Sequence, residues 1–476
     1  TLSANTCWDV SGELTVSNGA MLTVEEGVIL RFAEGAGLRA NGGLAIEGTG
    51  SSKVLLTGAE QSPGFWNGVL YYDSDRNANA VSHAVIEYGG GDELETYAGL
   101  ANLAVRQSDG SNTQVAVDDT ILRHSGANGF WANAHNLRSF ENNQVTNNDV
   151  PVRVEAPVIA YLATSSSYSG NSTDQIQIYD GDSHVYQDAE WSDLGIPYSI
   201  QHTMKVRGGA LTIAAGTQIT FGQGAGLDVR DDGRLAIQGT EDSNVLLTGA
   251  EQTRGFWAGV LYKDTNSPDN VIEHTTIEYA GGDSLATYAR AANLAVRESD
   301  GNRTQLAIEN TTLRHSGNWG FWANSHDLRS FTSNTITSNA KGTKVGANVI
   351  SSLDAASTYS GNDLDYVVLR DDTHVSGDHT WAAPDVPYRF DHDVRVREGT
   401  LVISEGTTLE SEGGGIDVRD TGRLTVDGTE SNPVLFTGVE KTSGFWNGIL
   451  YMDTNSTDNV IRNATIEYAG LDHLTT

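Results

Sequence analysis

Three loops rich in oxygen-bearing side chains are the residues of this sequence best suited to chemistry. They read DSDRNAN at 73–79, DTNSPDN at 264–270 and DTNSTDN at 453–459. Hard divalent cations prefer carboxylate and amide oxygens at alternate positions of a tight loop. The spacing therefore predicts calcium ligands, and the side chains expected to supply them are Asp73, Asp75, Asp264, Asn266, Asp269, Asp453, Asn455 and Asp458.

A calcium loop and a metal-free turn are the two interpretations of these residues. Calcium loops of the EF-hand type end on a bidentate glutamate, which is missing here. The first loop also has Ala78 where the other two have Asp269 and Asp458. In the metal-free alternative, each side-chain oxygen closes a corner of the chain as an Asx turn. The sequence leaves both interpretations open, and calcium is the one cofactor it suggests.

Other titratable residues do not form a recognisable catalytic set. Aspartate pairs begin at Asp118 and Asp231, but they fall at different positions of the repeated sequence, whereas general acid–base catalysis needs a fixed separation. His124 and His315 recur in the phrase LRHSG without the partners of a zinc site. P-loop and nucleophile-elbow motifs are absent from the sequence. We therefore expect a protein that is not an enzyme.

One ten-residue phrase occurs three times, as GFWNGVLYYD, GFWAGVLYKD and GFWNGILYMD. Its tryptophans are Trp66, Trp257 and Trp446. In an extended strand, neighbouring side chains point to opposite sides, so either the phenylalanine or the tryptophan of each phrase points outward. Two hypotheses follow: the tryptophans form a surface that stacks on sugar rings, or they pack into a corner of the fold.

The repeats divide the chain into modules. AVIEYGGGD (84–92) returns as TTIEYAGGD (275–283) at the same spacing as the tryptophan phrase. We expect two full modules, residues 1–190 and 191–380, and an incomplete third, residues 381–476. The third module stops partway through the pattern, so we expect the array to continue beyond this sequence.

Short β-branched runs closed by Gly, Asn or Asp fill each module, which is typical of strands. No segment keeps a helical apolar face, and hairpin dipeptides are scarce. This pattern predicts an all-β protein whose strands coil into a parallel β-helix, with Val, Ile and Leu inside and Gly, Asn and Asp at the corners. We expect one continuous rod of roughly 18–22 rungs, with strands of successive rungs ~4.8 Å apart.

Several phrases carry a resemblance to a known family. LTIAAGTQITF (211–221), GRLAIQGTEDSNVLLTG (233–249), WAGVL (257–261) and TIEYAG (276–281) resemble the right-handed parallel β-helix repeats of bacterial surface proteins and secreted fibres or adhesins. The resemblance covers nearly the whole chain. It implies a right-handed β-solenoid outside the cell, and its non-enzymatic members act as spacers, adhesins or fibres. The fold itself does not fix the function, because it also hosts lyases and hydrolases.

The charge balance limits the partners. The formal net charge is −33, with 62 acidic and 29 basic residues, of which only six are lysines. Such a surface repels nucleic acid and anionic membranes. No run approaches the ~20 apolar residues of a membrane span. We therefore expect copies of the protein or further modules end to end as partners, with glycans or a cell surface beside them.

Together these observations predict a non-enzymatic, extracellular structural β-solenoid, such as a filament subunit, a stalk or an adhesin segment of a bacterial surface. The alternative is a polysaccharide-binding or polysaccharide-degrading β-helix. A catalytic cleft would place acidic residues in one module only, whereas a structural array would repeat its surface.

Overall fold

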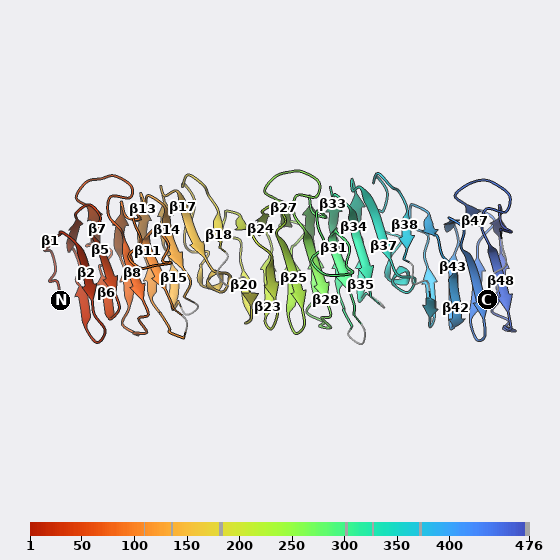
Figure 1. Ribbon diagram of the computed structural model, residues 1–476, viewed down its shortest axis with the longest axis horizontal. Helices are drawn as coiled ribbons and strands as arrows, with labels where there is room; N and C mark the ends of the chain where they lie inside the picture. Colours follow the sequence, from red (N-terminus) through yellow and green to blue (C-terminus); the bar gives the residue numbers. More distant parts are fainter. Residues whose placement is uncertain are drawn as a thin grey trace. The chain divides into compact units, whose positions relative to one another are not determined.

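The computed structural model consists of short strands and, in its described part, two short 3-10 helices, η1 (Ala156–Tyr161) and η2 (Val349–Ser352) (Figure 1). The structure describes residues 1–108, 110–134, 137–179, 184–299, 303–325, 328–370 and 374–471. The chain divides into two compact units, which are considered separately below. Unit 1 comprises residues 1–202 and 211–220, and unit 2 comprises residues 203–210 and 221–476.

Three parallel sheets build unit 1. The first contains β1 (Cys7–Val10), β4 (Ile29–Phe32), β7 (Val54–Gly58), β10 (Ala84–Glu87), β13 (Ile121–Arg123) and β16 (Gln144–Thr146). The second contains β2 (Glu13–Val16), β5 (Gly37–Ala40), β8 (Val69–Tyr72), β11 (Ala101–Arg106), β14 (Asn128–Ala132), β17 (Val150–Val154) and β18 (Ile176–Ile178). The third contains β3 (Met21–Val24), β6 (Gly43–Glu47), β9 (Ala80–Ser82), β12 (Ala116–Asp118) and β15 (Ser139–Glu141).

Unit 2 is built in the same way. One sheet contains β22 (Met204–Val206), β25 (Gly226–Arg230), β28 (Gly259–Lys263), β31 (Ala292–Arg297), β34 (Trp319–Asn324), β37 (Lys341–Val345), β38 (Val367–Leu369), β41 (Tyr388–Phe390), β44 (Thr408–Ser411), β47 (Val434–Gly438) and β50 (Ala464–Ile466). Its neighbours include β27 (Val245–Gly249), β30 (Thr275–Glu278), β33 (Thr312–Arg314) and β36 (Thr335–Thr337) on one side, and β26 (Arg234–Gln238), β29 (Val271–Glu273), β32 (Ala307–Glu309) and β35 (Ser330–Thr332) on another. The remaining strands include β42 (Val394–Glu398), β45 (Gly415–Arg419), β48 (Gly448–Met452) and β49 (Val460–Arg462).

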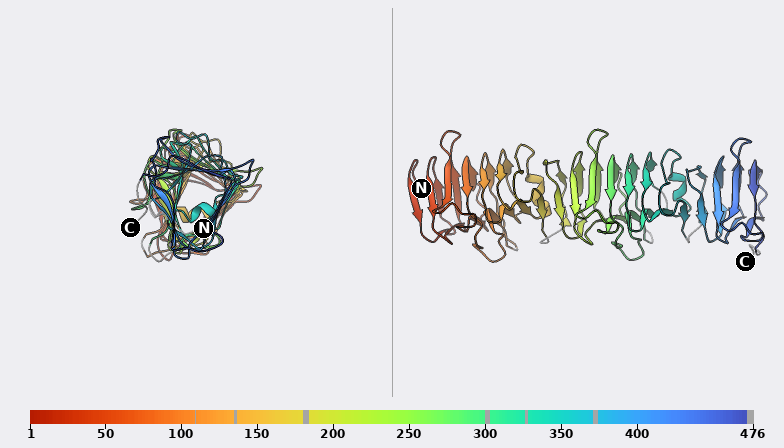
Figure 2. Two further views of the ribbon diagram at one scale, coloured as in Figure 1. Left: turned by 90° about the vertical axis from the view of Figure 1, so that its right-hand side faces the viewer. Right: turned by 90° about the horizontal axis from the view of Figure 1, so that it is seen from above.

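The strands pair in parallel, usually with the strand three places further along the chain, so each circuit of three strands stacks on the circuit before it (Figure 2). Leu227 pairs with Val260, Val260 with Leu294, and Leu294 with Phe321. All four side chains are buried, which makes a continuous apolar column along the inside of the sheet. The sequence prediction of a parallel β-helix is confirmed.

Buried asparagines stack along one corner of the coil in both units. In unit 2, Asn293 Nδ2 donates to Asn339 Oδ1 at 3.2 Å, and Asn339 Nδ2 donates to Asn362 Oδ1 at 2.9 Å. Asn339 Nδ2 also donates to the carbonyl of Leu313. These side chains satisfy backbone groups that the corner would otherwise bury without a partner. An equivalent column in unit 1 contains Asn102, Asn148 and Asn171.

Aromatic residues, as well as Gly, Asn and Asp, occupy left-handed corners. Tyr88 and His124 have φ values of 64° and 55°, and their rings stack with centroids 5.2 Å apart. Tyr279 and His315 repeat this arrangement at 62° and 57°, with centroids 5.0 Å apart. The sequence expectation of small polar corner residues was therefore incomplete, because ring stacking between coils can offset the cost of this backbone conformation.

Candidate functional site

The repeated tryptophans lie inside the coil. Trp66 and Trp257 have no exposed area and Trp446 is 1% exposed, whereas the preceding phenylalanine of each phrase is partly exposed. None of the three indole rings offers a face to a sugar in this structure. Burial therefore favours the corner-packing hypothesis over the sugar-stacking one.

Each buried tryptophan ties neighbouring coils together. Trp257 stacks on Phe221 with ring centroids 4.1 Å apart and planes 3° apart, and its Nε1 donates to the carbonyl of Glu278 at 2.8 Å. The Glu278 carboxylate in turn accepts Thr248 Oγ1 at 3.0 Å and Arg314 Nε at 2.7 Å. We call this set the Trp–Glu clamp. It joins β27, β30 and β33, three successive strands of one sheet.

The clamp recurs in unit 1, and its tryptophan-to-carbonyl bond recurs in the third copy of the phrase. Trp66 Nε1 donates to the carbonyl of Glu87 at 2.8 Å and stacks on Phe32 with centroids 4.0 Å apart. Trp446 Nε1 donates to the carbonyl of Glu467 at 2.7 Å. Three copies of one phrase thus make the same internal bond to within 0.1 Å.

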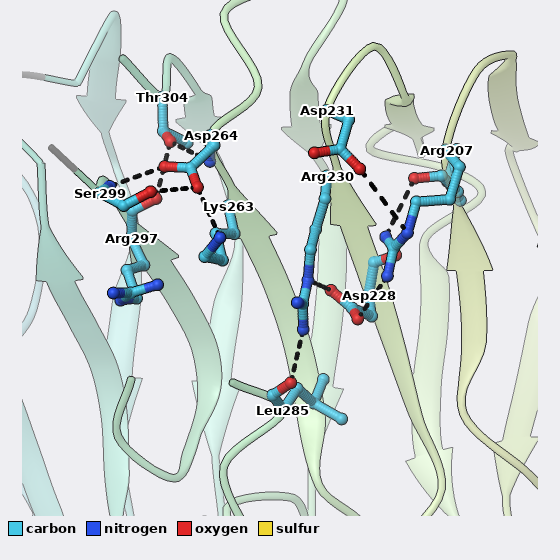
Figure 3. Close-up of polar contacts among 11 residues, drawn as sticks. Arg207, Asp228, Arg230, Asp231, Lys263, Asp264, Leu285, Arg297, Ser299 and Thr304 are labelled. Carbon is cyan, nitrogen blue, oxygen red and sulfur yellow. Dashed lines mark hydrogen bonds and ion pairs between the residues drawn. The ribbon is translucent and has the colours of Figure 1, made fainter. Parts of the chain in front are cut away.

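The aspartate that opens each acidic loop in the two full modules braces its loop against the next coil. Asp73 Oδ1 accepts Ser108 N at 2.7 Å, and its Oδ2 accepts Ser108 Oγ at 2.6 Å. Asp264 accepts the same two groups from Ser299, and Lys263 Nζ lies 2.5 Å from Asp264 Oδ2 (Figure 3). Burial alone would raise the pKa of Asp264, but the bonds from Lys263 and Ser299 hold this pKa below its usual value. Asp264 is therefore a carboxylate at neutral pH and an acceptor only.

The other predicted calcium ligands do not converge on one point in the described structure. Asp75 bonds Gln114 Nε2. Exposed Asp269 faces Arg234 at 3.6 Å, and exposed Asp458 faces Arg423 at 4.0 Å. Asn266, Asp453 and Asn455 are exposed to solvent. Among the described residues, no group of three or more His, Cys, Asp or Glu side chains is placed to hold a metal ion. Calcium binding stays a prediction.

The residue that holds each loop was overlooked in the sequence. It is the closing asparagine, shared by all three loops and represented in unit 2 by Asn270, which is fully buried. Asn270 Oδ1 accepts Leu235 N at 3.1 Å, and its Nδ2 lies within bonding distance of the carbonyls of Thr265 and Gln305. One side chain thereby satisfies backbone groups of three coils. The available signal was its presence in all three loops, where the acidic positions after the opening aspartate vary.

A polar hollow of about 780 Å³ lies beside the second loop. Its lining includes Asp231, Asp232, Asp264, Asn266 and Arg303. Two of the predicted calcium ligands therefore border a real depression of unit 2. Acidic and basic side chains alternate around it, which suits a polar ligand better than an apolar one.

A buried charge network supports one side of this hollow. The Asp228 carboxylate is 4% exposed and pairs with Arg207 Nη2 at 2.9 Å and with Arg230 Nε at 2.7 Å (Figure 3). Arg230 Nη2 also donates to the carbonyl of Leu285 at 2.7 Å, which anchors the loop after β30. Two guanidinium groups around one carboxylate compensate its burial. Asp231, on the rim, lies 4.0 Å from Arg207 and is exposed.

A second surface feature was also missed. Tyr97 and Tyr288 are 80% and 81% exposed, at corresponding positions of unit 1 and unit 2. Both have positive φ, 68° and 64°. In each unit, the loop carrying this tyrosine covers an outward apolar cluster that includes a tryptophan, Trp131 or Trp322. The signal was the phrase TYA, which occurs in both full modules.

Comparison of the chain with protein families, with curated proteins and with solved structures finds no match. The described part of the chain has no helix with the length and apolar character needed to cross a membrane.

Proposed function

We propose that this chain is a non-enzymatic structural β-solenoid of a bacterial surface or extracellular fibre. One observation carries the proposal: in all three copies of the phrase, the tryptophan donates to a glutamate carbonyl inside the coil. Residues repeated for a catalytic or binding purpose need access to solvent. Residues repeated for internal bonding instead extend the scaffold by adding further coils of the same kind.

The exposed surface supports the same function. Tyr97 and Tyr288 present the same side chain from the same loop of successive modules. A repeated surface suits a stalk or an adhesin, which contacts its surroundings at several points, better than it suits a single active site. The net charge of −33 keeps such a surface away from nucleic acid.

End-to-end stacking is the proposed mode of assembly. Each unit is a stack of parallel coils of one kind, and coils of further modules or of another copy can pair their strands in the same way. Copies of the chain or additional modules are therefore the proposed partners.

A polysaccharide-binding or polysaccharide-degrading protein is the second candidate. It is favoured by the hollow of about 780 Å³, where Asp231, Asp232 and Asp264 stand close to arginines. Against catalysis there, Asp264 is locked by Lys263 and Ser299 and its pKa is lowered, so it cannot serve as a general acid near neutral pH.

Turnover assays separate these two functions. The full chain is incubated with neutral and acidic polysaccharides, and release of reducing ends and of unsaturated products is followed. We expect no turnover above a heat-denatured control. Sustained product release that is lost in Asp231→Asn or Asp232→Asn would overturn the structural proposal in favour of an enzyme.

A further inference from the structure

A second, smaller hollow of about 270 Å³ lies on the outer side of β34, β37, β38 and β41 in unit 2. At one end, the ammonium groups of Lys341 and Lys344 lie 5.2 Å and 5.9 Å from the centroid of the same indole ring, that of Trp319. The chain has only six lysines against 62 acidic residues, and two of the six lysines lie at this end of the hollow.

These two positive charges are not neutralised within the described structure. Lys341 Nζ donates to Asn318 Oδ1 at 3.1 Å, a neutral acceptor. Neither lysine forms an ion pair with a carboxylate of the described residues, whereas Arg389 of the same hollow pairs with Glu410. Two ammonium groups on one ring repel each other, and an anion placed between them would relieve that repulsion.

The opposite end of the hollow has the reverse polarity. Arg389 stacks on Tyr366, with its guanidinium carbon 3.7 Å from the ring centroid, and pairs with Glu410 at 2.6 Å. Its Nε is buried without a hydrogen-bond partner in the described structure. The carboxylates of Asp391 and Glu412 complete this end. Carboxylates accept hydroxyl groups readily and repel a second negative charge.

The wall between the two ends is apolar and aromatic. Leu364 is 38% exposed, and Tyr366 and Val368 lie beside it. Such a wall suits the C–H face of a sugar ring, and a hollow of this size has room for about one or two rings.

Unit 1 has no counterpart of this hollow in its sequence. Where unit 2 has Trp319, Lys341, Tyr366, Val368 and Arg389, unit 1 has, in the same order, Asn128, Val150, Gln175, Gln177 and Ser199. The clamp residues, in contrast, are the same in both units.

We infer that this hollow binds an acidic sugar, with its acid group between Lys341 and Lys344 and its hydroxyl groups toward Asp391 and Glu412. The division of the hollow into a cationic end and an anionic end selects a ligand with one acid group on a hydroxyl-rich body. A simple anion would use only the lysine end, and a neutral sugar would leave the lysines unpaired. This site goes beyond the scaffold function, which stands whether or not the site binds.

Calorimetric titration of the full chain tests the inference, with a disaccharide of galactose and one galacturonic acid as the acidic probe, a galactose disaccharide as the neutral probe and sodium sulfate as the simple anion. We expect the acidic disaccharide alone to bind measurably, and its affinity to fall as salt is raised. Lys344→Gln should weaken binding at least tenfold, and Lys344→Arg should retain most of it.

Controls use the residues of unit 1. Lys341→Val carries the residue found at this position in unit 1, and it should weaken binding while keeping its thermal midpoint. Arg153→Gln, at the position in unit 1 that matches Lys344, should bind as the unaltered chain does. Equal binding of the galactose disaccharide, equal binding of sulfate, undiminished binding by Lys344→Gln, or no binding at millimolar probe would each overturn the inference.

Discussion

The Trp–Glu clamp and the outer hollow of unit 2 behave in opposite ways when the modules are compared. The clamp is repeated with the same residues and nearly the same distances, as Trp66 and Trp257 show. The hollow of unit 2 is built from residues that differ from those of unit 1, since Trp319 and Lys341 replace an asparagine and a valine. The repeated clamp thus forms internal bonds, whereas the residues that depart from the repeat form the surface that we propose as a binding site.

The turn after β25 shows a third behaviour, in which a function is kept while the residues change. In unit 2, Arg230 donates a hydrogen bond to the carbonyl of Leu285 and forms an ion pair with buried Asp228. In unit 1, the turn is two residues shorter, and Arg39 holds the carbonyl of Leu94 and pairs with Glu95 at 2.6 Å. The covering loop is anchored in both units, but only unit 2 buries a carboxylate between two arginines.

The largest effect is expected where the clamp is broken. Trp257→Ala should lower the free energy of unfolding by about 3–5 kcal/mol, because it leaves a cavity and removes the bond to the Glu278 carbonyl. Urea unfolding followed by circular dichroism measures this. Lys341→Val, which introduces the residue of unit 1 at the outer hollow, is the matched control and should cost far less. A loss below about 1 kcal/mol in Trp257→Ala would contradict the importance of the clamp.

The charge network of unit 2 should have the next largest effect. Asp228→Asn leaves Arg207 and Arg230 without their shared carboxylate, and we expect a loss of about 2–3 kcal/mol in unfolding free energy. Asp231→Asn, on the exposed rim, should change it by less than about 0.5 kcal/mol. Equal effects of the two variants would show that burial of Asp228 does not matter.

Acid should weaken the brace formed by Asp264. Its pKa is lowered in the folded chain, so the folded state binds fewer protons than the unfolded state near and below the ordinary value of 3.8. The stabilisation is complete above that value and is lost as pH falls through the lower, folded-state pKa. As pH is lowered across this range, the free energy of unfolding should therefore fall less steeply for Asp264→Asn than for the unaltered chain. Parallel profiles would show that the carboxylate contributes nothing.

The smallest effect is expected from calcium removal. Asp73 and Asp264 are already bonded to serines of the next coil, so the loops hold their shape through protein groups. We expect a chelator to shift the thermal midpoint by less than about 0.5 °C, which corresponds to about half a kcal/mol in a chain of this size. A shift of many degrees, reversed by added calcium, would instead establish the predicted calcium loops.

The sequence was sufficient for the strands and their parallel stacking, because β-branched runs such as LTIAAGTQITF alternate with asparagine and glycine corners. The sequence could not decide whether the Trp257 side chain points into the coil or outward, since the alternation of side chains along a strand allows either direction. It located the acidic loops but not the fact that Asn270, rather than the aspartates, holds three coils together.

The outer hollow was beyond the reach of the sequence for a different reason. Trp319, Lys341 and Arg389 become neighbours only when the register between coils is known, and the sequence does not fix the length of each circuit. The left-handed tyrosines at 88 and 279 were unpredictable on similar grounds, because their stabilising contact is a histidine of the next coil.

Deletion of one whole module, residues 191–380, tests most directly the claim that the repeats exist to add coils. The second module contributes seven strands to the sheet of unit 2 that begins with β22, namely β22, β25, β28, β31, β34, β37 and β38. With coils ~4.8 Å apart, the long dimension measured by small-angle X-ray scattering should decrease by about 34 Å, with the cross-section unchanged. An unchanged long dimension, or a chain that no longer shows β structure, would contradict the account.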